Sequence, residues 1–151
     1  DDKLVFCEAA SRTGGGEILG QMIELFDIHL TKAFCQAQCE HPFTNKDIEG
    51  LDWCERKPKV SHMVGWVFIY PTIGTLTSIP DQCDEEYVVD YFKVGQPGQV
   101  YHSRKDCADT VASFIVKGDT EEEVKQNIEL AYQWFKGHSY WETSNTVTLY
   151  K

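Results

Sequence analysis

Basic residues are scarce in this chain. Its 151 residues include 14 Lys and Arg against 24 Asp and Glu, which gives a formal net charge of −10. Nucleic acids and anionic membranes bind proteins through clusters of basic side chains, and the sequence contains no such cluster. The composition therefore argues against both classes of partner.

Long apolar runs are also missing. No run approaches the roughly 20 apolar residues that a membrane-spanning helix requires, and no signal peptide is recognisable. Six cysteines in 151 residues are more than average but do not make a small disulfide scaffold. We therefore expect a cytoplasmic protein with free thiols.

The sequence lacks the Cys-x-x-Cys spacing of a zinc knuckle. Cys35, Cys39, His41 and Cys54 still have the ligand types of a Cys₃His site, so a zinc-stabilised structural domain remains an alternative. Cys35 and Cys39 lie four positions apart in a predicted helix, where small buried thiols are common. Metal analysis of the purified protein would decide between these interpretations.

The residues that are present suit a globular domain. The chain is 42% hydrophobic and 25% charged, and its length is that of a single domain. Helical spacing of apolar residues dominates before residue 40, and two-residue alternation dominates after residue 63. This order predicts an α+β fold in which a short strand and two helices precede an antiparallel sheet covered by a C-terminal helix.

Individual elements follow from the same patterns. Helices are predicted at 18–26 and 30–37, and Thr120 with Glu123 forms a capping box at the start of a third helix, which ends near Gly137. Residues 40–60 and 104–109 are predicted loops, and the tail 138–151 is left unassigned. Pro71-Thr72 is predicted to form a hairpin or a corner. The predicted strands are Lys3–Cys7, Val64–Tyr70, Ile73–Ile79, Tyr87–Lys93, Val100–His102 and Val111–Val116.

Charged residues follow the first predicted strand directly. Glu8 and Arg12 share one face of an extended chain, and both need a partner if they are buried. Mg²⁺ and a phosphate are natural partners, with Glu8 on the metal and Arg12 on the phosphate. Gly14, Gly15 and Gly16 allow a sharp turn into a helix N-terminus, which favours anions. The alternative is a surface ion pair, Glu8 to Arg12, with glycines that serve only the turn.

The stretch Glu8-Ala-Ala-Ser-Arg12-Thr-Gly-Gly-Gly16 resembles the last core strand of the ATP-grasp ligases, where the pattern reads Glu-x-Asn-x-Arg followed by glycines. The resemblance implies that Glu8 binds Mg²⁺ and that Arg12 is catalytic, contacting the transferred phosphate or the carboxyl substrate. It also implies that Gly14, Gly15 and Gly16 belong to the site that binds ATP. Ala10 replaces the asparagine of the pattern, which implies altered coordination of a second Mg²⁺.

The resemblance covers most of the chain but only the C-terminal part of the family. Residues 1–40 correspond to the active-site wall, and residues 60–137 correspond to the small antiparallel module of biotin-carboxylase-like members. The implied reaction activates a carboxylate as an acyl phosphate with ATP and joins it to a nucleophile, usually an amine. ATP-grasp enzymes need about 300 residues or more. We therefore expect a domain cut from a longer enzyme, or a free-standing relative that needs a partner chain, and no activity from the isolated chain.

A non-catalytic binding module that keeps the fold without the ATP lobe is the main alternative. Ala10 and the short length favour it. A homodimer also stays open, and the substrate is not predicted, because substrate contacts in this family come largely from the absent lobes. Among the histidines, His62 and His102 flank strands and could reach a site at the end of the sheet, although neither belongs to a recognisable catalytic pattern.

Overall fold

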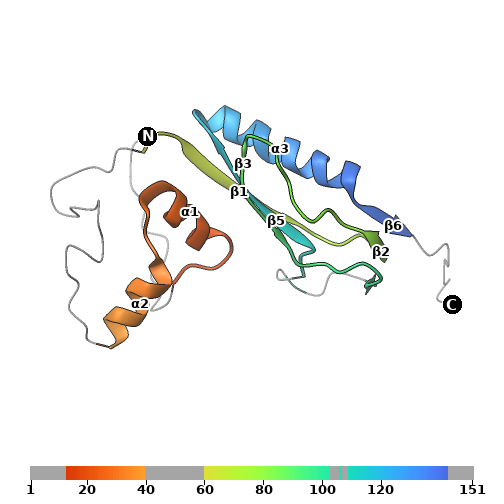
Figure 1. The fold of residues 1–151 in the computed structure, drawn as a ribbon, viewed down its shortest axis with the longest axis horizontal. Helices are drawn as coiled ribbons and strands as arrows, with labels where there is room; N and C mark the ends of the chain where they lie inside the picture. The colour runs from red at the N-terminus through yellow and green to blue at the C-terminus, as the bar shows by residue number, and fades with distance from the viewer. Residues whose placement is uncertain (1–12, 40–59, 103–105, 107–108, 143–151) are drawn as a thin grey trace. The chain divides into compact units, whose positions relative to one another are not determined.

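The structure is a computed structural model, and it describes residues 13–39, 60–102, 106 and 109–142. The chain divides into two compact units, Asp1–Lys59 and Val60–Lys151 (Figure 1). The predicted strand Lys3–Cys7 and nearly all of the predicted loop 40–60 lie outside the described residues. None of the described helices is long and apolar enough to cross a membrane.

The described part of the first unit consists of two helices, α1 (Ile18–Phe26) and α2 (Leu30–Gln38), which confirms both predictions. Asp27 ends α1 in the left-handed conformation, with φ of 54°. Its N–H donates to the carbonyl oxygen of Ile23 (2.8 Å), and the N–H of Ile28 donates to that of Met22 (3.2 Å). These bonds satisfy the last carbonyl groups of α1, as helix-ending motifs do.

The second unit contains two antiparallel sheets of three strands each within the described residues. One sheet has the strand order β1-β5-β3 and the other has the order β4-β2-β6. Together with the helices, they confirm the α+β class. The strands are β1 (Met63–Ile69), β2 (Gly74–Ser78), β3 (Val88–Lys93), β4 (Val100–Tyr101), β5 (Ala112–Gly118) and β6 (Tyr140–Glu142).

Two connections differ from the simplest expectation. Strands β1 and β2 belong to different sheets, so Pro71-Thr72 makes a corner and the hairpin alternative is wrong. The unassigned tail contributes β6, which pairs with β2. The hydroxyl of Thr77 also donates to the carbonyl oxygen of Tyr140 (3.0 Å). The end of the described chain thus completes the second sheet.

Helix α3 (Glu121–His138) lies along one face of the first sheet (Figure 1). The capping prediction is confirmed at Thr120, whose hydroxyl accepts from the N–H of Glu123 (3.2 Å). In a capping box the Glu123 carboxylate would accept from the N–H of Thr120. Here it accepts from the N–H of the preceding residue, Asp119 (2.8 Å). Both bonds satisfy N–H groups that have no partner within the helix or lie just before it.

The core lies between this sheet and α3. Five consecutive residues of β5, from Ala112 to Val116, are buried, as expected for a central strand. Phe114 stands opposite Val67 of β1 and Tyr91 of β3. The buried hydrophobic residues of this core are Ile69, Leu76, Ile79, Val111, Ala112, Phe114, Val116, Val124, Ala131 and Phe135.

Gly65 allows α3 to approach β1 closely. A Cβ atom at this position would lie 2.6 Å from Cγ1 of Val124 and 3.0 Å from Cδ1 of Ile128. With any larger residue, the Val124 and Ile128 side chains or the helix would therefore have to shift. The contact also identifies the face of β1 that α3 covers, since alternate residues of a strand point to the same side.

Candidate functional site

The predicted site residues are only partly within the described chain. Glu8 and Arg12 lie outside it, so their positions stay predictions. Gly14, Gly15 and Gly16 are described, and they make up the segment, called the glycine turn below, that leads through a turn at Gly16 and Glu17 into α1. The glycine turn is therefore the part of the predicted site that the structure describes.

The local structure explains why glycine occupies two of these three positions. Gly16 has φ of 66°, in the left-handed region where residues other than glycine are strained. A Cβ at Gly14 would lie 2.9 Å from Cδ1 of Ile18. Gly15 has neither constraint, because its φ is not in the left-handed region and no heavy atom of the described residues lies within 4 Å of where its Cβ would be. Within the described part of the chain, the turn and its packing thus leave Gly15 unexplained, and the space beside it is open.

The helix after this turn begins without a side-chain cap. Glu17 is the N-cap residue of α1, and its carboxylate accepts no capping hydrogen bond. The first turn of α1 contains no acidic residue, and the N–H of Gln21 donates to the carbonyl oxygen of Glu17 (3.0 Å). Uncapped N–H groups at a helix start attract anions. The arrangement is chemically suited to a phosphate or a carboxylate.

A polar pocket of about 600 Å³ lies at the start of α3 in the second unit. Asn127 forms its buried wall, and its side-chain amide donates to the carbonyl oxygen of Lys117 (2.8 Å). Of the two histidines that flank strands, His62 lines this pocket and His102 does not. The lining residues are Ser61, His62, Glu86, Tyr87, Lys117, Gly118, Asp119, Glu123 and Asn127.

Sequence reasoning missed Asn127. Its position within the α3 periodicity predicts only a helical residue, and its partner is a backbone carbonyl of β5. The carboxylates of Glu86, Asp119 and Glu123 give the pocket an excess of negative charge over Lys117. Its chemistry therefore favours ligands with hydrogen-bond donors, in contrast to the anion-binding character of the glycine turn.

The cysteines correct one expectation. Cys35 on α2 and Cys39, which directly follows α2, are both exposed, so the prediction of small buried thiols is wrong for both. Cys35, Cys39 and Cys83 are free thiols, as expected, and burial raises the pKa of the Cys83 thiol. The described residues contain no group of three or more potential metal ligands. His41 and Cys54 lie outside them, so the zinc hypothesis is untested.

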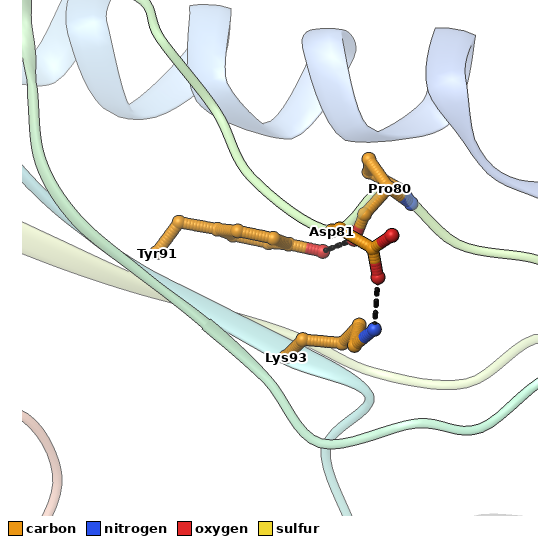
Figure 2. A network of polar contacts seen from close by, with 4 residues as sticks. All are labelled: Pro80, Asp81, Tyr91 and Lys93. Atoms are coloured by element: carbon orange, nitrogen blue, oxygen red, sulfur yellow. Dashed lines mark hydrogen bonds and ion pairs between the residues drawn. The ribbon is translucent and has the colours of Figure 1, made fainter.

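A network of polar contacts fastens the loop after β2, at Pro80 and Asp81, to β3 (Figure 2). The hydroxyl of Tyr91 donates to the carbonyl oxygen of Pro80 (3.0 Å), and the ammonium of Lys93 forms an ion pair with Asp81. Burial raises the pKa of Tyr91 above its usual range, and the bond to Lys93 lowers the pKa of Asp81. Every group in this network has a partner, so we interpret it as structural.

Comparison of this chain with known proteins identifies its fold through similar solved structures. No protein-family model matches the chain, and no curated protein is similar to it in sequence. Among solved structures, it is similar to phosphoribosylglycinamide synthetase from Anaerococcus prevotii, with a TM-score of 0.59 and 11% identity over 85% of this chain and 30% of that one. It is also similar to L-amino acid ligase from Bacillus licheniformis, with a TM-score of 0.59 and 15% identity over 89% of this chain and 32% of that one.

Both proteins are ATP-grasp ligases. The matched region is about a third of each of them, which agrees with the partial resemblance seen in the sequence. The chain therefore has the fold of one part of an ATP-grasp ligase.

Proposed function

We propose that this chain is the C-terminal part of an ATP-grasp ligase that activates a carboxylate as an acyl phosphate and joins it to an amine. The observation that carries the proposal is the fold, which the chain shares over 85% and 89% of its length with two such ligases. One of them is named for ligation of an L-amino acid, which favours a small carboxylate and a small amine as substrates.

The residues of the Glu8 to Gly16 stretch would perform distinct tasks. Glu8 would hold Mg²⁺, which supplies positive charge beside the phosphates when it is bound. The Arg12 guanidinium would stabilise negative charge on the transferring phosphoryl group. The N–H groups of the glycine turn would hold the acyl oxygens. The open space at Gly15 and the uncapped start of α1 fit an anionic ligand.

The isolated chain is expected to have no ATP-dependent activity. Phosphoryl transfer requires groups that surround the β- and γ-phosphates, and the family supplies these from a lobe that this chain does not resemble. Mg²⁺-dependent ATP hydrolysis by the purified 151 residues, with contamination excluded, would contradict this part of the proposal.

The complete protein that contains this chain provides the main test. ADP release that depends on Mg²⁺, a carboxylate and an amine would be measured for Glu8→Gln and Arg12→Ala, together with the melting temperature of each variant. Glu8→Gln should abolish Mg²⁺-dependent turnover, and Arg12→Ala should lower kcat by about 10²–10³. Both should melt close to the parent protein, because they act on ligands. Glu129→Gln and Lys136→Ala, which change exposed residues of α3, serve as matched controls.

Two further outcomes bear on the assignment. Ala10→Asn should tighten Mg²⁺ binding if it restores an oxygen ligand at the site. An unchanged Mg²⁺ dependence across Glu8→Gln, Arg12→Ala and Ala10→Asn would refute the site. A complete protein without ATP-dependent activity would instead identify the chain as a binding module.

Gly15 allows a sharper test within the described residues. Gly15→Ala adds a methyl group into open space, so folding should be unaffected. If the ligand occupies that space, turnover should fall about tenfold or more, a change of about 1.4 kcal/mol in activation free energy. Gly137→Ala also adds a methyl group into open space and should leave turnover unchanged. Equal activity of the two variants would argue against ligand contact at the glycine turn.

A further inference from the structure

One long segment of this acidic chain carries no charge. No Asp, Glu, Lys or Arg occurs from Val60 to Pro80, although a quarter of the chain is charged. Strand β1, Met63–Ile69, lies inside this segment. A strand that combines apolar side chains with an absence of charge is suited to pairing with another strand.

The two edges of the first sheet differ in how they are protected. Strand β3 forms one edge, and it carries Asp90, Lys93 and a register irregularity between Val88 and Asp90. Charges and bulges hinder pairing with a further strand. Strand β1 forms the other edge and has neither, since its register with β5 is continuous from Met63 to Ile69. Among the described residues, no strand pairs with its outer side.

The outer face of β1 is aromatic. Gly65 faces α3, so Val64, Trp66 and Phe68 point away from the helix. The rings of Trp66 and Phe68 have centroids 4.6 Å apart, and Trp66 is 39% exposed. Phe92 of β3 lies on the same face, because it stands in register with Ser113 of β5, as Phe68 does, and it is 42% exposed.

We propose that β1 pairs with β1 of a second copy of this chain. The two strands would run antiparallel about a twofold axis near Trp66 and join two sheets into one continuous sheet. Trp66 would then face the partner's Trp66, and Val64 would face the partner's Phe68. This interface goes beyond the proposed ligase activity and does not depend on it.

Symmetry and the lack of charge make β1 the place where a second copy can bind. Two copies that each carry a net charge of −10 repel each other overall, so a contact between them costs least where no like charges meet, as along the uncharged β1 segment. An antiparallel pair about a twofold axis uses the same surface on both sides. Even-numbered residues of one β1 stand opposite even-numbered residues of the other, so the aromatic faces of the two strands lie on the same side of the joined sheet.

Sedimentation equilibrium over a concentration series, up to about 1 mM, tests the proposal on the full chain. The mass should rise from that of one chain to that of two. Trp66→Lys should raise the dimer Kd about tenfold or more, whereas Phe92→Lys, a matched change on the same face at the other edge, should not. A monomer throughout, or an equal effect of both variants, would overturn the proposal.

Cross-linking provides a second readout that does not depend on Trp66→Lys folding. Cβ atoms of directly opposed residues in an antiparallel pair lie about 4.5–5.5 Å apart, close enough for a disulfide after small adjustment. Trp66→Cys should give a covalent dimer under mild oxidation, linked through position 66 in peptide mapping. Phe92→Cys and the unchanged chain should not form that dimer. A non-covalent dimer without a link at position 66 would also overturn the proposal.

Discussion

The Tyr91 hydroxyl donates a hydrogen bond to the carbonyl oxygen of Pro80 across 3.0 Å, and this bond is partly buried. The neighbouring ion pair between Lys93 and Asp81 is in a different environment, because the Asp81 side chain is 89% exposed. Both contacts hold the same loop against β3 (Figure 2). Since water competes only weakly with the sheltered bond, Tyr91 should contribute more to stability than Asp81.

Tyr91→Phe should therefore lower the free energy of unfolding by about 0.5–1.5 kcal/mol. The ring and its packing against Phe114 would remain, so the change isolates the hydroxyl. Asp81→Asn should have a smaller effect in the same urea titration. A larger loss in Asp81→Asn than in Tyr91→Phe would show that the ion pair, rather than the hydrogen bond, holds the loop.

Alkaline pH should destabilise the chain partly through Tyr91. Burial raises the pKa of Tyr91 in the folded state, so the unfolded chain loses this proton first, near pH 10. The stabilisation is thus complete below about pH 10 and declines as pH rises further. Tyr91→Phe should show a shallower decline of unfolding free energy between about pH 10 and 12. Burial also raises the pKa of Tyr87 and Tyr101, so some of the slope should remain.

Thr120→Ala should destabilise the second unit by about 0.5–2 kcal/mol, because it removes the side-chain cap of α3. Thr120→Ser keeps a hydroxyl that can accept from the N–H of Glu123 and should stay close to the parent protein. Urea unfolding followed by circular dichroism measures both. Equal losses in the two variants would assign the effect to the Thr120 methyl group instead of the cap.

Gly65→Ala should cost about 1–3 kcal/mol, because the new methyl group would lie 2.6 Å from Cγ1 of Val124. Gly137→Ala, within α3, meets no atom within 4 Å and should be neutral or stabilising by up to about 1 kcal/mol. Adding Val124→Ala to Gly65→Ala should recover part of the loss through relief of the clash. No recovery in the double variant would place the strain elsewhere.

Gln21→Met should raise the free energy of unfolding by up to about 1–3 kcal/mol. The side-chain nitrogen of Gln21 is buried and has no hydrogen-bond partner among the described residues, and removing such a donor relieves its desolvation cost. Methionine has a similar length and helix propensity. Gln133→Met is the control, because it removes an exposed hydrogen bond to Glu129 and should bring no gain. A destabilised Gln21→Met would indicate that this nitrogen is satisfied in solution.

The parts of the fold that were predictable depend on neighbours in sequence. The helix spacing of α1 and α2 and the Thr120 cap of α3 are local patterns, and the structure confirms them. Strand β6 was not predictable, because it is three residues long and its partner β2 lies more than sixty positions earlier. Local patterns also do not decide whether Pro71-Thr72 turns within one sheet or between two.

The residues of the candidate site likewise divide into those that local sequence patterns predict and those that depend on distant parts of the chain. The glycines of the turn were recognisable because three glycines in a row allow a sharp backbone turn. Asn127 was not recognisable, since its role depends on the Lys117 carbonyl at the end of β5. The exposure of Cys35 and Cys39 likewise depends on what packs against α2, which helical spacing alone does not reveal. Glu8 and Arg12 remain predictions.

Pairing between non-consecutive strands has a consequence for how this chain is made. Among the described strands, none pairs with the next one in sequence, and β5 lies between β1 and β3. On the ribosome, β1 and β3 therefore cannot enter their sheet until β5, which ends at Gly118, has been synthesised. Until then the uncharged β1 segment is exposed in a growing chain, so slow folding and a need for chaperone protection during translation are expected.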